Sequence, residues 1–452
     1  MELANKNILV VGLGKSGRAA AQFAARQQAR VTVTDLNVAA NLTAFLPGLK
    51  DQGIRLVLGE HPGDIFKQVE LIVVSPGVPH TIAPLELARQ AGVPILGELE
   101  FAARFVREPV VAITGTNGKT TTTALVGDML EQSGKRVFVG GNIGNPLIDY
   151  VAGGGGADLV VLEVSSFQLD TASTLRANVA VLLNISADHL DRYDDFEAYV
   201  RSKGRIFRNQ TQADTAVINR MDPEIKKLAD ACRARVWPFF HTGRNGSMPA
   251  TGAEILTNRL VLRTGGAPLV LDLQGIPLTG AHNRENIAAA ALAALAVGGT
   301  AGGIQQAIGQ FHGLAHRLET VATVKGVLYV DDSKGTNVDA VSRALESLNQ
   351  PTVLIMGGRE RGGDYTLLKP QLEKTVKRLV VMGEAATAIA DQLGAFAPVE
   401  NAADMAQAVR LAAAAADPGD VVLLSPACSS FDMYDSYAQR GEDFCKQVNA
   451  LK

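Results

Sequence analysis

The sequence predicts an α/β protein of three domains, each built on a mostly parallel sheet covered by helices. Two observations predict this class. Short runs of Val, Ile and Leu alternate with helical stretches along almost the whole chain, and such continuously apolar runs are typical of strands buried on both faces. The chain has 452 residues, of which 47% are hydrophobic, and this is enough for several separate cores.

The first predicted domain covers residues 1–107. Its strands are expected at residues 8–11, 30–34, 56–58, 71–74 and 93–96. Gly12, Gly14 and Gly17 form a G-x-G-x-x-G turn between the first strand and a helix, and Asp35 closes the second strand. This arrangement indicates a Rossmann-like domain with a pyrophosphate at the helix N-terminus. The turn fits a dinucleotide or a UDP-sugar equally well, and it also fits glycines that serve only close helix–strand packing.

The second predicted domain covers residues 108–314. Its strands are expected at residues 110–113, 137–139, 159–163, 179–184 and 215–218. The first of these runs leads into residues 114–121, Thr-Gly-Thr-Asn-Gly-Lys-Thr-Thr, which precede a helix. In such a unit the glycines let backbone N–H groups surround phosphate oxygens, while Lys119 reaches the terminal phosphates and Thr120 the accompanying Mg²⁺. We therefore expect a P-loop ATPase-like domain that uses ATP.

Residues 238–277 interrupt this pattern with Gly and Thr turns around short apolar runs. These runs lie at residues 254–256, 260–262 and 269–271, and they predict a small β insertion. An uncharged run follows at residues 287–304 and consists mostly of Ala and Gly. Because Ala and Gly contribute little transfer free energy, this run predicts a buried helix that ends at Gly298, not a membrane span.

The third predicted domain covers residues 315–452. Its strands are expected at residues 328–330, 353–356, 378–381 and 421–424. Helical stretches separate these strands, among them the Ala-rich run at residues 403–416. The alternation of strand and helix indicates a second Rossmann-like α/β domain.

The composition narrows the range of partners. The chain has 43 Lys and Arg against 46 Asp and Glu, a net charge of −3, and it lacks a basic stripe with interleaved aromatic residues. We therefore expect small-molecule substrates and no nucleic acid. Cys232, Cys428 and Cys445 lack the spacing of a zinc site or a disulfide framework, and the first residues lack the features of a signal peptide. These features favour a cytoplasmic protein without a membrane partner.

Two further positions in the second domain suggest a metal site. Glu163 ends one predicted strand, and the next strand leads to His189. A carboxylate and an imidazole at neighbouring strand ends, near a phosphate loop, form a candidate Mg²⁺ site. Lys203 follows in a helical stretch, where the pattern alone favours an ordinary surface lysine.

Several segments together resemble one known family. They are residues 114–121, 163–169, 184–192, 282–286 and 316–319. Their order, and their spread over the predicted domains, are similar to those of the Mur ligases of peptidoglycan synthesis. Members of this family use ATP to join an amine to a UDP-MurNAc-linked carboxylate through an acyl phosphate.

The resemblance implies roles for individual residues. The catalytic residues would be Lys119, Glu163, His189 and Lys203. ATP would contact Gly115, Thr116, Asn117, Gly118, Lys119, Thr120, Thr121, Asn283, Asn286, Arg317 and Asp332. Mg²⁺ would be held by Thr120, Glu163, His189 and Lys203. Lys203 matches a lysine that the family carries as a carbamate, which turns a cation that repels Mg²⁺ into an anion that helps to hold it.

The same resemblance assigns the two other substrates. The UDP end would contact Gly14, Lys15, Ser16, Asp35, Ser75, Gly77 and Asn142. The third domain most resembles that of the members that add D-glutamate to UDP-MurNAc-L-Ala. D-Glutamate would be bound by Lys334, Thr336, Arg361, Ser430 and Tyr437. The two basic side chains in this set suit the carboxylates of an acidic amino acid.

Other interpretations remain open from the sequence. A folylpolyglutamate synthase-like ligase shares the phosphate loop and the acyl-phosphate chemistry, but it does not need the first domain. An NAD-dependent oxidoreductase fused to a P-loop module explains both glycine turns, but it leaves His189 and Lys203 without roles. A regulatory ATP-binding protein without catalysis is a third possibility. As a Mur-type ligase, the protein is expected to be a monomer whose domains close around the substrates.

Overall fold

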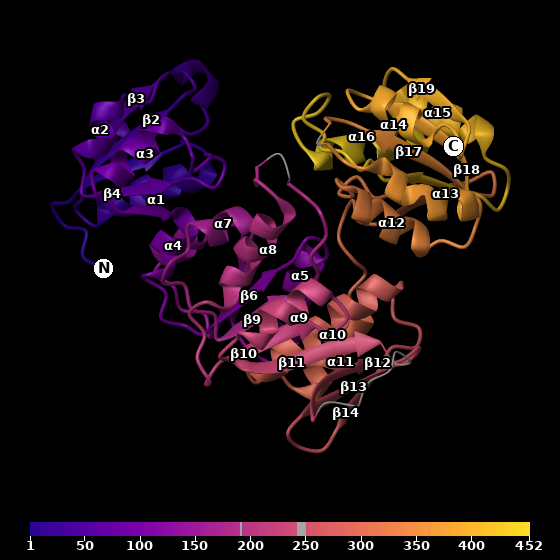
Figure 1. Cartoon of the computed structure of the whole chain (residues 1–452), viewed down its shortest axis with the longest axis horizontal. Coiled ribbons are helices and arrows are strands. Elements are labelled where there is room, and N and C mark those ends of the chain that lie inside the picture. The colour runs from indigo at the N-terminus through magenta and orange to yellow at the C-terminus, as the bar shows by residue number, and fades with distance from the viewer. Residues whose placement is uncertain (190–191, 242–249, 361) are drawn as a thin grey trace. The chain divides into compact units, whose positions relative to one another are not determined.

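The computed structural model describes residues 1–189, 192–241, 250–360 and 362–452. Within these residues the strands form three separate sheets (Figure 1). The first sheet takes its strands from residues 7–97, the second from residues 110–272 and the third from residues 319–424. Helices alternate with the strands in all three regions, which confirms the predicted α/β class. The boundaries of the predicted domains stay a prediction.

The first sheet is parallel throughout and has the strand order β3-β2-β1-β4-β5. Its strands are β1 (Asn7–Val11), β2 (Arg30–Asp35), β3 (Arg55–Leu58), β4 (Leu71–Val74) and β5 (Ile95–Gly97). The helices of this region are α1 (Lys15–Arg26), α2 (Gly63–Lys67), α3 (Ala83–Gln90) and α4 (Glu98–Ala103). Because the chain order reverses between β1 and β4, a crevice opens at the carboxyl ends of these two strands.

The second sheet has the order β14-β13-β12-β11-β10-β9-β6-β8-β7, and among the described strands only the first two pairings in this order, β14 with β13 and β13 with β12, are antiparallel. Its strands are β6 (Val110–Thr114), β7 (Val137–Gly141), β8 (Leu159–Glu163), β9 (Val179–Leu182), β10 (Thr215–Asn219), β11 (Arg235–His241), β12 (Thr251–Ile255), β13 (Arg259–Thr264) and β14 (Leu269–Asp272). The predicted insertion strands are therefore present, but they extend the central sheet through β11 and form no sheet of their own. β11 itself was not predicted, because Pro238 in its middle argues against a buried strand.

The helices of the second region lie between its strands or follow them along the chain. They are α5 (Lys119–Gln132), α6 (Leu147–Ala152), α7 (Ser166–Asp170), α8 (Phe196–Gly204), α9 (Pro223–Asp230), α10 (Ala281–Ala296) and α11 (Ala301–Gln310). The Ala-rich run forms the buried helix α10 and ends before Gly298, as predicted, and α11 follows after the turn. None of the helices that the structure describes is both long and apolar enough to cross a membrane.

The third sheet has the order β15-β16-β20-β17-β18-β19, with β15 antiparallel to β16 and the other pairs parallel. Its strands are β15 (Glu319–Val324), β16 (Val327–Asp331), β17 (Thr352–Gly357), β18 (Val376–Met382), β19 (Val399–Ala402) and β20 (Val421–Leu424). The helices of this region are α12 (Val338–Glu346), α13 (Lys369–Thr375), α14 (Ala386–Leu393), α15 (Met405–Ala415) and α16 (Tyr437–Asn449). Apolar side chains fill both faces of the sheet, as its near-continuous apolar strands predict.

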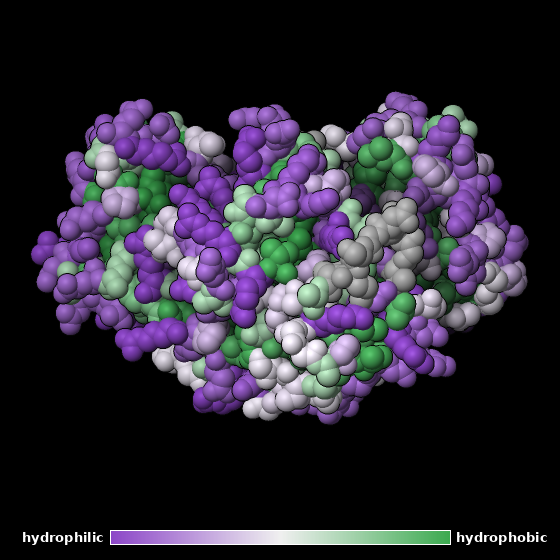
Figure 2. Space-filling view, turned by 60° about the horizontal axis from the view of Figure 1, so that its bottom comes forward, coloured by the Kyte–Doolittle hydropathy of each residue, from purple (hydrophilic) through white to green (hydrophobic). Residues whose placement is uncertain are grey.

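The described chain divides into two compact units. The first unit comprises Met1–Ile185, Val200–Gln274 and Glu285–Gly309, and it contains the first and second sheets. The second unit comprises Ser186–Tyr199, Gly275–Arg284 and Gln310–Lys452, and it contains the third sheet. On the face that Figure 2 shows, hydrophilic residues predominate and hydrophobic residues reach the surface in separate patches.

Candidate active site

The phosphate loop connects β6 to α5 in the first unit. Gly115 and Gly118 have φ angles of 157° and 83°, which favour glycine over residues with side chains. Gly118 directly precedes the first residue of α5, so the N–H groups of the first helical turn lie at the loop. The loop therefore has the backbone conformation of an anion site at a helix N-terminus.

The end of the neighbouring strand holds this loop in place. The carbonyl oxygen of Asn184 accepts the N–H of Thr116 at 2.9 Å, and its side-chain oxygen accepts the N–H of Asn117 at 2.8 Å. The side-chain amide of Asn184 also donates to the carbonyl of Asn117 at 3.0 Å. Asn184 belongs to a segment that carries the family resemblance, but its sequence position alone assigned it no role. Its three bonds show that it sets the shape of the loop.

Two ammonium groups meet at one carbonyl of the loop. The Nζ of Lys119 donates to the carbonyl oxygens of Gly115 at 2.9 Å and Thr116 at 2.8 Å, and the Nζ of Lys203 donates to that of Gly115 at 2.8 Å. Lys203 comes from α8 and is only 2% exposed, so the helical pattern alone was wrong to favour a surface lysine. Two ammonium groups this close together repel each other, and an anion bound beside them would reduce this repulsion.

Glu163 lies at the end of β8, which pairs with the phosphate-loop strand β6. Its side chain is buried, and its Oε1 accepts a hydrogen bond from the side-chain amide of Asn142 at 2.7 Å. Its Oε2 is buried and has no hydrogen-bond partner among the described residues. A buried carboxylate oxygen without a donor is costly, and a hard cation would satisfy it. Glu163 therefore fits the role of a Mg²⁺ ligand.

Helix α10 brings an amide group against the loop. Asn286 is buried, and its Oδ1 accepts the hydroxyl of Thr122 at 3.3 Å. A Cβ added at Gly118 would overlap the side chain of Asn286, so the two segments touch directly. Asn283, one turn earlier, donates from its side chain to the carbonyl of Thr279 at 2.7 Å.

A cavity of about 520 Å³ opens at the carboxyl ends of the first sheet. All the residues that the family resemblance assigned to the UDP end of the substrate line it. They are Gly14, Lys15, Ser16, Asp35, Ser75, Gly77 and Asn142. They follow strands β1, β2, β4 and β7, which lie far apart in the sequence. The crevice at the reversal of strand order therefore gathers them into one site, and its ligand stays a prediction.

Hydrogen bonds shape the walls of this cavity. The hydroxyl of Ser75 donates to the carbonyl of Gly12 at 2.8 Å, and Asp35 accepts the N–H of Leu13 at 2.6 Å. Lys15 donates to the carbonyl of Gly144 at 2.9 Å and to the side chain of Asn145 at 3.0 Å. Lys15 thus joins the glycine turn to the segment after β7, although it was predicted to lie near a pyrophosphate. Its side chain lines the cavity as well.

In the second unit, Asp332 follows β16 and is buried. Its Oδ2 accepts the hydroxyl of Ser425 at 2.7 Å. Burial raises the pKa of Asp332 to about 7, although the hydrogen bond from Ser425 and the charge of Arg317 oppose this change. A cationic or hydrogen-bonding ligand near Asp332 would favour its ionised form.

Arg440 of α16 connects the loops that follow β16, β17 and β20. Its guanidinium is buried and donates to the hydroxyl of Ser333 at 3.0 Å and to its carbonyl at 2.8 Å. It also donates to the carbonyls of Cys428 at 3.1 Å and Gly357 at 3.3 Å. Burial lowers the pKa of Arg440 to about 10. The sequence pattern did not predict this role, because Ser333 and Gly357 lie far from Arg440 along the chain.

The predicted amino-acid site lies among these loops. The Nζ of Lys334 is 3.8 Å from the centre of the Tyr437 ring, a cation–π contact. Ser430 is buried, and Thr336 is half-buried. Arg361 lies outside the described residues. The structure thus brings Lys334 and Tyr437 together, and their role in binding an amino acid stays a prediction.

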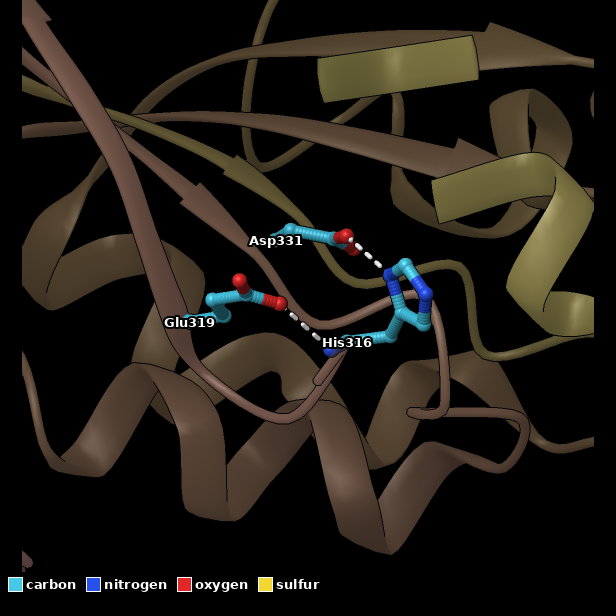
Figure 3. A group of neighbouring side chains, drawn as sticks. All are labelled: His316, Glu319 and Asp331. Atoms are coloured by element: carbon cyan, nitrogen blue, oxygen red, sulfur yellow. Dashed lines mark hydrogen bonds and ion pairs between the residues drawn. The ribbon is translucent and has the colours of Figure 1, made fainter. Parts of the chain in front are cut away.

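His316, Glu319 and Asp331 form a compact group beside this site (Figure 3). The Nδ1 of His316 lies 2.7 Å from Asp331 Oδ2, and the backbone N–H of His316 donates to Glu319 at 2.8 Å. These residue types bind metals, but here hydrogen bonds already use the atoms that would face an ion. The ring of His316 packs edge-on against Tyr437, with 6.3 Å between the ring centres. The group therefore supports the position of Tyr437.

His189 also belongs to the second unit. It has a φ of 56°, and its Nε2 lies 3.7 Å from Asp188 Oδ2. The carboxylate of Asp188 is itself held in position, because the side-chain amide of Asn337 donates a hydrogen bond to it at 3.1 Å. His189 packs against the ring of Tyr199. Its predicted role beside Glu163 stays a prediction.

Three family profiles match the chain in the order of its sheets. They are the MurD-like N-terminal domain of Mur ligases over residues 6–97, the Mur ligase middle domain over residues 113–294 and the Mur ligase glutamate ligase domain over residues 316–428. The chain is 51% identical to the UDP-N-acetylmuramoylalanine–D-glutamate ligase of Desulfosudis oleivorans, over 100% of this chain and 98% of that protein. It is 49% identical to the ligase of the same name from Desulfatibacillum aliphaticivorans, over 100% of both proteins.

Solved structures with the same fold cover the whole chain. The pseudomurein peptide ligase type C from Methanothermus fervidus matches with a TM-score of 0.64 at 20% identity, over 99% of this chain and 100% of that one. The MurF ligase from Thermotoga maritima, in complex with ADP, matches with a TM-score of 0.60 at 19% identity, over 100% of this chain and 97% of that one. At such low identities these matches show the shared fold.

Proposed function

Because the chain belongs to the Mur ligase family, we propose that it adds D-glutamate to UDP-N-acetylmuramoyl-L-alanine in an ATP-dependent, ADP-forming step of peptidoglycan precursor synthesis. The full-length relatives at 51% and 49% identity carry this reaction in their names. The observation that carries the proposal is the meeting of Lys119 and Lys203 on the phosphate loop. Family membership over the whole chain replaces the folylpolyglutamate synthase-like, oxidoreductase and regulatory interpretations.

The reaction needs activation because a carboxylate is a poor electrophile. A carboxylate oxygen of UDP-MurNAc-L-Ala attacks the γ-phosphorus of ATP, the bond to the β-phosphate oxygen breaks, and ADP leaves. The amine of D-glutamate then attacks the acyl carbon, phosphate leaves with the bonding electrons, and the amine gives up a proton. Lys119 neutralises charge on the transferred phosphoryl group, and the loop N–H groups hold its oxygens.

Mg²⁺ would be held by Thr120, Glu163 and His189, with Lys203 as a carbamate. The unpartnered Oε2 of Glu163 supports this assignment. When bound, Mg²⁺ neutralises phosphate charge. As an ammonium, Lys203 would repel the metal ion. Loss of one proton gives the neutral amine, and addition of CO₂ to its Nζ with loss of a second proton makes a carbamate anion with two oxygen ligands.

D-Glutamate would bind between the loops of the third sheet. Lys334 and Arg361 supply positive charge for its carboxylates, Thr336 and Ser430 supply hydroxyl groups, and Tyr437 packs against its short stem. The buried hydrogen bonds of Arg440 support this arrangement, because they hold the loops that carry Lys334 and Ser430.

We further propose that the enzyme acts as a monomer in the cytoplasm. Its cysteines are free thiols, which suits a reducing compartment. Water must be kept from the acyl phosphate, because it would hydrolyse this intermediate unproductively. Domain closure around the bound substrates would meet this need.

Phosphate release tests the proposal directly. The protein is given ATP, Mg²⁺ and UDP-MurNAc-L-Ala, with D-Glu, L-Glu, meso-diaminopimelate or L-Lys as the amine. Turnover with D-Glu alone supports the proposed reaction. Turnover with another amine would keep the ligase chemistry but overturn the roles of Lys334, Thr336, Ser430 and Tyr437. If no phosphate is released with any of the four amines, the proposed function is contradicted.

A further inference from the structure

His61 lines the cavity of the first sheet, although the sequence motifs gave it no role. It follows β3, and its ring packs edge-on against Phe66 with 6.0 Å between the ring centres. The Oγ1 of Thr34 lies 2.9 Å from His61 Nδ1 and also 2.9 Å from the carbonyl oxygen of Glu60. These two contacts decide which nitrogen of the ring carries a proton.

A threonine hydroxyl has one proton to donate. A carbonyl oxygen can only accept, so the hydroxyl of Thr34 donates to Glu60. Its oxygen must then accept from His61, and Nδ1 of His61 carries the proton. The opposite assignment would place two lone pairs against each other at 2.9 Å between Thr34 and Glu60. The hydrogen-bond network therefore selects the Nδ1–H tautomer.

In this tautomer the other ring nitrogen, Nε2, is a hydrogen-bond acceptor. No described residue hydrogen-bonds with Nε2, so it is the polar atom that His61 can offer to a ligand of the cavity. Burial lowers the pKa of His61, although the nearby charge of Asp35 opposes this effect. The ring is therefore neutral near pH 7, and Nε2 keeps its lone pair.

Asp35 is the carboxylate among the described residues that line this cavity, and hydrogen bonds within the chain already use both of its oxygens. One of its carboxylate oxygens accepts the backbone N–H of Leu13 at 2.6 Å. The other accepts the backbone N–H of Asn37 at 2.8 Å and its side-chain amide at 3.0 Å. His61 thus offers an acceptor atom that the fold itself leaves unused.

We propose that His61 determines specificity for the base of the nucleotide substrate, with Nε2 accepting the ring N–H of uracil. This proposal rests on the proposed function, which places a UDP-linked substrate in the cavity. Uracil carries a ring N–H between its two carbonyl groups, whereas cytosine carries a bare ring nitrogen at the same place. A cytosine ring would bring its lone pair against that of Nε2, and a site built around one hydrogen bond rejects a ligand that cannot make it.

Two variants separate this role from the packing of His61. In His61→Asn, the side-chain amide keeps a donor near the position of Nδ1 for Thr34, but no atom reaches the position of Nε2. In His61→Gln, the longer side chain brings a carbonyl oxygen to the region of Nε2. The Asn variant should therefore lose recognition of the base, and the Gln variant should keep much of it.

Calorimetric titration of the full-length protein with UDP and with CDP tests the proposal. We expect the wild type to bind UDP at least about tenfold more tightly than CDP, and His61→Asn to reduce this ratio to about twofold or less. His61→Gln should keep a ratio nearer that of the wild type. Equal binding of UDP and CDP by the wild type, or an unchanged ratio in His61→Asn, would overturn the proposal.

Nitrogen NMR of protein with labelled histidines supplies an independent readout. The His61 signal, identified by its loss in His61→Gln, should be that of a neutral Nδ1–H ring, and UDP should shift its Nε2 resonance. A neutral Nε2–H ring would overturn the proposal even if UDP binds. If the wild type binds neither nucleotide, the substrate assignment itself fails, and that result differs from the loss of selectivity alone.

Discussion

The two glycine turns of the first unit both lead into a helix, but they differ in backbone conformation and in the side chains around them. After β1, the turn is braced by the neutral hydroxyl of Ser75, and Lys15 donates to the segment after β7. After β6, the ammonium groups of Lys119 and Lys203 meet on the turn itself. From this comparison we expect the backbone N–H groups at the first turn to serve diphosphate binding, whereas phosphoryl transfer at the second turn would also need cations at the reacting end.

Loss of Lys119 should give the largest effect. We expect Lys119→Ala to lower the rate of phosphate release by about 10³-fold or more, roughly 4 kcal/mol of transition-state stabilisation. Calorimetry should show unchanged binding of UDP, because the first turn does not use Lys119. Loss of both phosphate release and UDP binding would instead indicate misfolding, and this variant could then not distinguish the two turns.

Loss of Lys203 should be nearly as severe. We expect Lys203→Ala to lower the rate by about 10²-fold or more, because Lys203 would serve the metal as a carbamate. Added bicarbonate should restore little activity, since the variant has no amine to carry CO₂. Mass spectrometry of the native wild-type protein should detect one bound CO₂. Full activity of the variant would remove Lys203 from the mechanism.

The contact between helices α4 and α6 should make the stability of the protein depend on pH. Glu98 of α4 is buried, accepts the N–H of Ile148 at 3.0 Å, and has an Oε2 without a hydrogen-bond partner among the described residues. Burial raises the pKa of Glu98 from 4.5 to about 7. The folded chain therefore keeps a proton that the unfolded chain releases, and this contribution is complete below about pH 4.5 and is lost as the pH rises through about 7.

The expected size of this loss is roughly 3 kcal/mol at most. Thermal unfolding of the wild type and Glu98→Gln between these pH values measures it. Because glutamine stays neutral, the stability of the wild type relative to the variant should fall as the pH rises. A difference that does not change with pH would contradict the shifted pKa.

The conformation of the first glycine turn can be disrupted by a substitution that changes no charged side chain. A Cβ added at Gly17 would overlap the carbonyl of Gly12 and the hydroxyl of Ser75, whereas a Cβ added at Gly14 would meet nothing within 4 Å. We expect Gly17→Ala to destabilise the protein by roughly 1–3 kcal/mol and to weaken UDP binding. Gly14→Ala is the matched control and should leave the melting temperature nearly unchanged. Equal melting temperatures for both variants would refute the packing argument.

Loss of Lys15 should give the smallest effect. Its bonds to Gly144 and Asn145 are exposed, so Lys15→Ala should weaken UDP binding by less than about fivefold, or roughly 1 kcal/mol. Calorimetry measures this value beside that of Lys119→Ala for ATP. A loss of a hundredfold would show that Lys15 binds the pyrophosphate directly, and it would make the two turns more alike than their hydrogen bonds indicate.

Most strands could be predicted because apolar runs and glycine turns are local signals. The runs before Gly12 and the phosphate loop became β1 and β6 with shifts of a residue at their ends. The missed strands β15 and β19 lie at the edges of the third sheet and are partly exposed, so they lack a continuous apolar run. Strand β11 was not predicted, because a proline in the middle of an apolar run argues against a buried strand.

The sequence by itself determined the α/β class, the two glycine turns and the family, because each can be recognised from short segments whose residues are close together along the chain. The tertiary structure decided that Lys203 is buried against Gly115, that Arg440 joins three loops, and that Thr34 sets the tautomer of His61. The physical reason is that a hydrogen bond needs atoms within about 3 Å. Only the folded chain brings such distant residues to that separation.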